Sequence, residues 1–302
     1  MPHLTRLIPL WTVVVAVAVS TAISGRFDRP SDVFDVAVSG AGRPVILIPG
    51  LSTTGVVWDA TVVALRDRHE VHVLTLAGFG GPEPVGEPFL PRVARGVIDY
   101  VKARDLRQPV IVGHSLGGFA AFAAAAEAPD LFGGVVAVDG VPFLPALADP
   151  AATADGQVAQ AASIKALYAS LTREQFLAQN RLALGSMITD PVNVEHAVGW
   201  AARADPGAVG VAVAEMLTTD LRPRVSAIRA PVLLIGALGA VPEAMRPAVR
   251  AGYEAQVARI PDATVVFAER ARHFIMLDDP VFLHETLSAF LARTAGPVDR
   301  GR

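Results

Sequence analysis

The sequence predicts an α/β fold in which helices flank a mainly parallel sheet. Short runs of Val, Ile and Leu bounded by turn residues are typical of strands buried on both faces, and they recur along the chain, for example at residues 45–48 and 110–112. Helical patterns separate these runs, and such alternation favours parallel pairing. Residues 143–224 break the alternation and have the composition of several helices. We therefore expect a helical cap inserted after the strand that ends near Val138.

The first part of the predicted core, residues 25–142, contains five strands and three helices. The strands are expected at residues 33–38, 45–48, 71–76, 110–112 and 135–138. The helices are expected at residues 56–66, 90–101 and 119–127. The second helix has one apolar face, marked by Leu90, Val93, Val97 and Val101. Pro109 and Pro129 follow the second and third helices, as is common beyond a helix end.

The core pattern returns after the cap, so residues 225–302 form its second part. Strands are expected at residues 232–235 and 264–267, with helices at 247–258 and 279–292. Asp278 and Asp279 precede the last helix and are expected to cap its N-terminus.

Composition excludes several classes of protein. With 26 basic and 29 acidic side chains the formal charge is −3, which argues against nucleic acid as a partner. The absence of cysteine excludes disulfides, thiolate zinc sites and a cysteine nucleophile. No His-Glu-x-x-His pattern, carboxylate cluster or dinucleotide-binding glycine turn is present, so neither a metal nor a cofactor is expected.

Residues 1–24 have the layout of a secretory leader. His3 and Arg6 precede a run without charge from residue 7 to residue 23, and Ser24 offers a small residue for cleavage. A run of about 17 apolar residues is also near the lower limit for an uncleaved membrane anchor. We expect export to the periplasm or the medium by one of these routes, with membrane contact only through this segment.

Ser115 is the candidate nucleophile. It lies in Gly113-His114-Ser115-Leu116-Gly117, between a β-branched strand and a helix-forming run, which is the context that a strained strand-to-helix turn requires. Glycines on either side allow backbone to approach where a Cβ would clash. Leu116 begins the helix, and its backbone N–H is a candidate donor to an oxyanion.

These motifs resemble those of the α/β-hydrolase fold superfamily, and the resemblance extends over nearly all of residues 33–293. Further support comes from Leu47-Ile48-Pro49-Gly50-Leu51, which is similar to the family's oxyanion loop, and from Ala271-Arg272-His273-Phe274 near the end. The resemblance implies that the backbone N–H of Leu51 is the second oxyanion donor. It also implies that His273, in the loop after the last core strand, is the general base.

A serine nucleophile and a histidine base are usually completed by a carboxylate, which forms a Ser–His–acid triad. No motif in the sequence marks that carboxylate directly. The family most often carries it after the strand at 232–235, but Gly236-Ala237-Leu238-Gly239-Ala240 contains no carboxylate. Asp139 directly follows the strand at 135–138, at the sheet edge where catalytic groups gather, and some members place their acid there. Asp139 is therefore the preferred candidate, with Glu243, Asp278 and Asp279 as alternatives.

The predicted function is a serine hydrolase that cleaves a carboxylic ester through an acyl-enzyme on Ser115. The cap is rich in Ala, Leu and Val, which predicts an apolar small-molecule substrate, and Met187, Trp200 and Met216 are candidates to line the pocket or to pack within the cap. Other triad chemistry remains open: amide or carbon–carbon bond hydrolysis, acyl transfer or perhydrolysis. A ligand-binding homologue without catalysis is the alternative from another class of protein.

Overall fold

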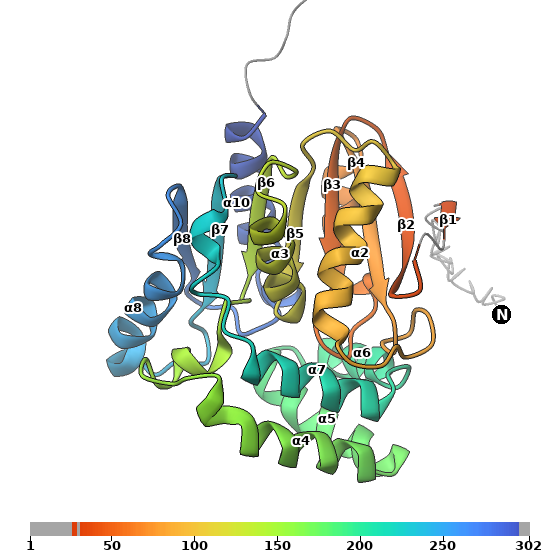
Figure 1. Ribbon diagram of the computed structural model, residues 1–302, viewed down its shortest axis with the longest axis vertical. Coiled ribbons are helices and arrows are strands. Elements are labelled where there is room, and N and C mark those ends of the chain that lie inside the picture. Colours follow the sequence, from red (N-terminus) through yellow and green to blue (C-terminus); the bar gives the residue numbers. More distant parts are fainter. Residues whose placement is uncertain (1–25, 29–30, 296–302) are drawn as a thin grey trace, which may run out of the picture.

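A single eight-stranded sheet forms the centre of the computed structural model, which describes residues 26–28 and 31–295 (Figure 1). Its strands are β1 (Arg26–Asp28), β2 (Phe34–Gly40), β3 (Arg43–Ile48), β4 (His69–Leu76), β5 (Val110–His114), β6 (Gly134–Val138), β7 (Val232–Ala237) and β8 (Ala263–Ala268). They lie in the order β1-β2-β4-β3-β5-β6-β7-β8. Only the β1–β2 and β2–β4 pairs are antiparallel, so the predicted mainly parallel sheet is confirmed.

Helices cover both faces of this sheet. They are α1 (Asp59–Leu65), α2 (Phe89–Ala103), α3 (Leu116–Glu127), α8 (Arg246–Val257), α9 (Ile275–Asp278) and α10 (Pro280–Arg293). Helices α2, α3 and α8 pack on one face, and α1 and α10 pack on the other. Figure 1 shows α2 and α3 in front of the sheet and α10 behind it. An apolar core lies between the sheet and the helices on each face, and successive residues of β3 pack into the two cores alternately. Ile46 and Ile48 lie in the core with α2, α3 and α8, and Val45 and Leu47 lie in the core with α1 and α10. Burial on both faces explains why the strand sequences are continuously apolar.

Four longer helices form the cap between β6 and β7. They are α4 (Val158–Ser170), α5 (Arg173–Met187), α6 (Pro191–Ala201) and α7 (Pro206–Thr218). Figure 1 shows them across one end of the sheet. Local sequence determines where two of them begin: the Asp190 and Asp205 side chains accept from backbone N–H groups of α6 and α7, and each helix has proline in its first position.

Short 3₁₀ helices account for the main differences from the expected elements. They are η1 (Gly55–Trp58), η2 (Leu144–Leu147), η3 (Asp155–Gln157), η4 (Val225–Ala227) and η5 (Glu243–Met245). The helix expected at 56–66 is divided into η1 and α1. The cap begins with loops and short turns because Pro142, Pro145 and Pro150 lack the N–H groups that a continuing helix needs.

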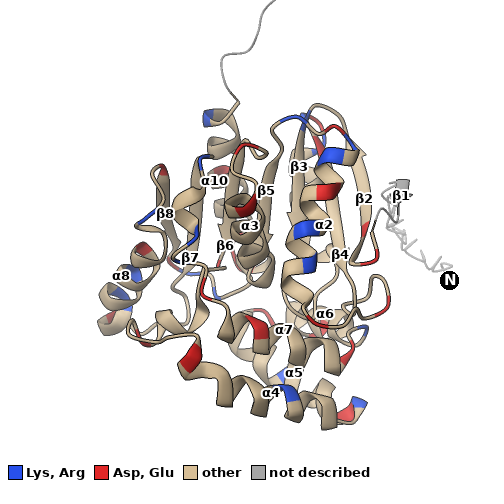
Figure 2. Ribbon diagram, viewed as in Figure 1, with Lys and Arg blue, Asp and Glu red and all other residues tan. Residues whose placement is uncertain are grey.

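Most charged side chains lie on helices and connecting segments, and Asp35, Arg43 and Glu70 lie on β2, β3 and β4. The central strands β5 and β6 carry none (Figure 2). Within residues 26–28 and 31–295, no helix combines the length and apolar character needed to cross a membrane. The predicted leader, residues 1–24, lies outside the residues that the structure describes.

Candidate active site

Ser115 lies on the bend between β5 and α3. Its backbone has φ 53° and ψ −116°, outside the regions that residues with side chains ordinarily occupy. Its N–H donates to the carbonyl of Val138 at 2.9 Å, and its carbonyl accepts from the N–H of Phe119 at 3.1 Å. The surrounding strand and helix therefore hold a strained residue in place, as is common at functional sites.

Two glycines make this bend possible. A Cβ on Gly113 would lie 2.0 Å from the carbonyl oxygen of Gly117, and a Cβ on Gly117 would lie 2.3 Å from the carbonyl oxygen of Ile48. Both obstructing atoms belong to the backbone and cannot rotate away. The close approach of β3, β5 and α3 at this point therefore requires glycine at both positions.

The structure brings His273 and Asp139 together from positions 134 residues apart. Asp139 directly follows β6, and His273 lies in the loop after β8. The His273 Nδ1 atom is 2.6 Å from Asp139 Oδ2. Glu243, the alternative acid, is exposed at the start of η5. The carboxylate placed against the imidazole is thus the one that follows β6, on the strand next to β7 in the sheet.

The Asp139 carboxylate accepts three hydrogen bonds. Besides His273, the backbone N–H of Ala237 donates to Oδ1 at 2.8 Å, and the hydroxyl of Tyr253 donates to the same oxygen at 2.5 Å. Asp139 itself has a positive φ of 50°. Burial and the neighbouring negative charge of Asp139 raise the pKa of Tyr253 well above 10, so the phenol stays protonated and can donate.

Tyr253 was not singled out from the sequence. It lies inside the helix expected at 247–258, and no motif marks it. The available signal was a tyrosine on the buried face of that helix, since a buried hydroxyl needs a hydrogen-bond partner.

The buried ring of His114 packs against the loop that carries His273. Its ring lies 4.6 Å from the His273 ring and 4.7 Å from the Phe274 ring, and its Nε2 atom is 3.1 Å from the His273 carbonyl oxygen. Burial, followed by repulsion from His273, lowers its pKa well below 6.5. The neutral ring therefore donates from Nε2 to the carbonyl, which leaves Nδ1 without a proton.

The two candidate oxyanion donors flank the serine. Leu116 is the first residue of α3, and the N–H groups of a first helical turn have no partner within the helix. Leu51 lies in the loop after β3 and lines the cavity at Ser115. This loop abuts the bend so closely that a Cβ on Gly50 would lie 3.3 Å from the Cβ of Ser115.

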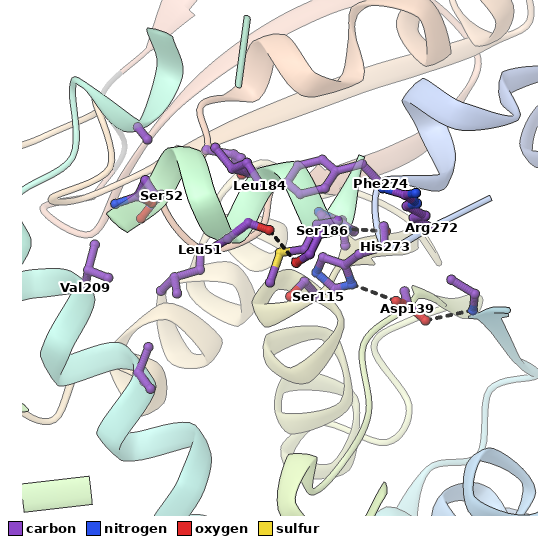
Figure 3. Close-up of a pocket in the computed structure, with 18 of the residues that line it drawn as sticks. Leu51, Ser52, Ser115, Asp139, Leu184, Ser186, Val209, Arg272, His273 and Phe274 are labelled. Carbon is purple, nitrogen blue, oxygen red and sulfur yellow. Dashed lines mark hydrogen bonds and ion pairs between the residues drawn. The ribbon is translucent and has the colours of Figure 1, made fainter. Parts of the chain in front are cut away.

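A cavity of about 470 Å³ connects Ser115, Asp139 and His273 with the cap (Figure 3). Its wall is mostly apolar and includes Leu51, Leu144, Leu184, Met187, Val209 and Met216. Met187 and Met216 therefore face the cavity, whereas Trp200 packs against the core that contains α1 and α10. The cavity extends from the edge of the sheet to α5 and α7, which gives an apolar ligand a wall contributed by the cap.

The cap is tied to the His273 loop by Asp278. Its Oδ1 atom accepts from the Thr189 N–H, and its Oδ2 atom accepts from the Thr189 hydroxyl and the Arg272 N–H, each at 2.9 Å. Only Asp279 caps the last helix, through the N–H of Phe282. The expectation that Asp278 is also a cap is therefore wrong, because its carboxylate is engaged by Thr189 and Arg272.

Among the residues that the structure describes, no group of three or more His, Cys, Asp or Glu side chains could hold a metal ion. The donor set at the cavity is instead a hydroxyl, an imidazole and a carboxylate. A mainly parallel sheet with a serine on the bend after a central strand, a His–Asp pair at the same edge and an inserted helical cap defines the α/β-hydrolase class of fold.

Comparison with known proteins agrees with this class. The family model described as "Alpha/beta hydrolase family" matches residues 45–286, and the chain belongs to that family. The chain is 28% identical over 207 residues to a pimeloyl-[acyl-carrier protein] methyl ester esterase of Vibrio cholerae, which covers 68% of this chain and 80% of the relative. The enzyme of the same name from Aeromonas hydrophila is 26% identical and covers 83% and 96%.

Solved structures show the same fold. A hydrolase from Pseudomonas aeruginosa superposes with a TM-score of 0.73 at 22% identity, covering 89% of this chain and 98% of that one. A thermophilic esterase from Thermogutta terrifontis superposes with a TM-score of 0.69 at 21% identity, covering 86% and 94%. The predicted fold class, including the cap, is confirmed.

Proposed function

We propose that this protein hydrolyses a carboxylic ester through an acyl-enzyme on Ser115. The observation that carries the proposal is the 2.6 Å contact between His273 and Asp139, at the edge of the cavity that Ser115 also lines. A serine hydroxyl becomes an effective nucleophile when a base accepts its proton, and a carboxylate on the far side of the imidazole fixes the required tautomer. The names of the relatives in Vibrio and Aeromonas, both ester hydrolases, support the same reaction.

The reaction follows from the positions of these groups. The Ser115 oxygen attacks the ester carbonyl carbon while His273 Nε2 accepts the hydroxyl proton. The carbonyl oxygen becomes negative and accepts hydrogen bonds from the N–H groups of Leu51 and Leu116. The alcohol leaves with the proton from His273, and water then repeats the sequence on the acyl-enzyme, which releases the acid and restores Ser115. The Asp139 carboxylate stabilises the imidazolium in both halves of the reaction, acylation and deacylation.

The substrate is an ester with an apolar acyl or alcohol part. The wall formed by Leu144, Leu184, Val209 and Met216 offers contacts to hydrocarbon. Arg272 also lines the cavity, but its guanidinium donates to the carbonyl oxygens of Gly185 and Ile188. An uncharged chain is therefore favoured over one that ends in a carboxylate.

The test combines a covalent probe with a series of esters. A fluorophosphonate should add to the native protein, and peptide mass spectrometry should locate the adduct on Ser115. The kcat/KM values for p-nitrophenyl esters should rise from acetate to a medium acyl chain, by about 10-fold or more, because each buried CH₂ contributes about 0.8 kcal/mol.

Heat-denatured protein is the control, since the probe requires the assembled site. Absence of an adduct on native protein, together with binding of an apolar ester without turnover, would favour the non-catalytic alternative.

Export is a further part of the proposal. The uncharged run at residues 7–23, preceded by Arg6 and followed by Ser24, supports a cleaved leader or an anchor. We expect full-length protein expressed in a bacterium to appear in the periplasm or medium with a new N-terminus near Gly25, or in the membrane fraction with the leader intact. N-terminal sequencing of each fraction checks this, and intact protein found only in the cytosol would contradict it.

A further inference from the structure

The hydroxyl of Tyr253 reaches the carboxylate of the proposed triad from a separate element. Tyr253 lies on α8, 114 residues after Asp139, and its side chain is buried. Its Oη atom is 2.5 Å from Asp139 Oδ1. The proposed mechanism uses Asp139 and His273 but assigns no part to this phenol, so its contact with the carboxylate requires a separate explanation.

We propose that Tyr253 is a positioning residue that holds the Asp139 carboxylate in the orientation in which Oδ2 accepts the His273 ring proton. This inference rests on the proposed function, because it assigns Tyr253 a part in the same triad. Tyr253 does not line the cavity that holds Ser115, so it acts on the substrate only through Asp139 and His273.

The distribution of hydrogen bonds over the two carboxylate oxygens supports this assignment. Oδ2 faces His273, whereas Oδ1 accepts from both the Tyr253 hydroxyl and the Ala237 N–H. The two donors come from different elements, α8 and the end of β7, and together they fix the rotation of the carboxylate about the Cβ–Cγ bond of Asp139. With one of them removed, the group has greater freedom to turn away from the imidazole.

Small residues at the end of β7 leave room for the Tyr253 side chain. A Cβ on Gly236 would lie 3.0 Å from Cδ1 of Phe267 and 3.2 Å from Cδ1 of Tyr253, so a larger residue would press on both rings. The two rings pack edge to face, with centroids 5.9 Å apart at 88°. The end of β7 thus carries no carboxylate, and its residues Gly236 and Ala237 supply room for Tyr253 and an N–H for Asp139 instead.

The electrostatic surroundings make Tyr253 a constant donor. Burial and the charge of Asp139 keep its pKa well above 10, so it does not ionise in the range of an assay. The His114 ring, which packs against the His273 ring, is held neutral by burial. On α8, Arg246 and Arg250 pair with Glu269. Arg272, next to His273 in the chain, donates to cap carbonyls.

The test is the pH dependence of Tyr253→Phe, which removes the hydroxyl and keeps the ring. A carboxylate that loses this donor turns away from the imidazole more often and stabilises the imidazolium less. The acid limb of the kcat/KM profile should therefore move to lower pH by about half a unit. At the pH optimum, kcat should fall about 10-fold with KM nearly unchanged, since a hydrogen bond to a charged group is lost.

Tyr100→Phe is the matched control. The Tyr100 hydroxyl lies 2.7 Å from His72 Nδ1, and both residues are buried in the core away from the cavity. Its removal should lower the melting temperature without moving the pH profile. If Tyr253→Phe behaves in the same way, with an unchanged acid limb and kcat within about 2-fold of wild type, Tyr253 has only a structural part and the proposal is overturned.

An NMR titration separates this inference from the proposed function. The ring protons of His273, assigned by comparison with His273→Ala, report the titration midpoint of the imidazole whether or not any ester is hydrolysed. A midpoint at lower pH in Tyr253→Phe than in wild type supports the positioning of Asp139 even if no substrate is turned over. An equal or higher midpoint in an active enzyme would refute the positioning and leave ester hydrolysis standing.

Discussion

Replacing Ser115 with alanine is expected to lower kcat for a chromogenic ester by about 10⁶, the loss typical when a triad nucleophile is removed. The reason is that Ser115 lies on a strained bend at the cavity, next to the candidate oxyanion donors Leu51 and Leu116, and no other hydroxyl described there has this setting. Alanine adopts the same backbone conformation as serine and leaves the apolar wall intact, so KM should change little. Steady-state kinetics measure kcat and KM, and fluorophosphonate labelling should be lost in the Ser115→Ala variant.

Ser163→Ala is the control for this substitution. Ser163 is exposed on α4, and its hydroxyl donates to the carbonyl of Ala159 within the same helix. This variant should keep wild-type kinetics and labelling. A Ser115→Ala protein that keeps more than about one hundredth of the wild-type kcat would show that the nucleophile lies elsewhere.

Asp139→Asn is expected to lower kcat by about 10⁴ while the protein remains folded, a loss known for this change in other Ser–His–Asp enzymes. The hydrogen bonds around Asp139 explain why asparagine cannot substitute for it. The Ala237 N–H can only donate, so it holds the amide oxygen of the introduced side chain and turns the amide NH₂ towards His273. The ring then accepts at Nδ1 and carries its proton on Nε2, where it cannot take the proton of Ser115.

Glu243→Gln provides the comparison, because Glu243 was the alternative acid from the sequence and is exposed in η5. It should keep wild-type kcat. Circular dichroism and thermal unfolding check that Asp139→Asn is folded. Near-normal turnover in Asp139→Asn, or a large loss in Glu243→Gln, would remove Asp139 from the triad.

Much of the fold could be predicted from the sequence because a buried parallel sheet leaves a strong local pattern. The expected strands at 45–48, 110–112 and 135–138 differ from β3, β5 and β6 by one or two residues at their ends. β1 was not expected, since its three residues include two charged ones and carry no apolar alternation. The loops at the start of the cap were also missed, because scattered apolar residues there resemble helical sequence.

The site was predictable where a motif or a unique position marks a residue. Ser115 has the glycine-flanked bend, and His273 is the histidine in the loop directly after the last core strand. The contacts of Tyr253 and Asp278 were not predictable, because each depends on how α8 or the cap packs against a distant loop. Such contacts leave no local pattern, since the partners lie 114 and 89 residues apart.

The adjacency of β6 and β7 has an evolutionary consequence. Val138 pairs with Ile235, so the residues that follow the two strands begin roughly 5 Å apart, about one strand spacing. We therefore expect that a carboxylate directly after either strand would lie within reach of the same imidazole nitrogen. A lineage could therefore gain an acid on one strand before discarding the other, and pass from one arrangement to the next through ancestors that stayed active throughout.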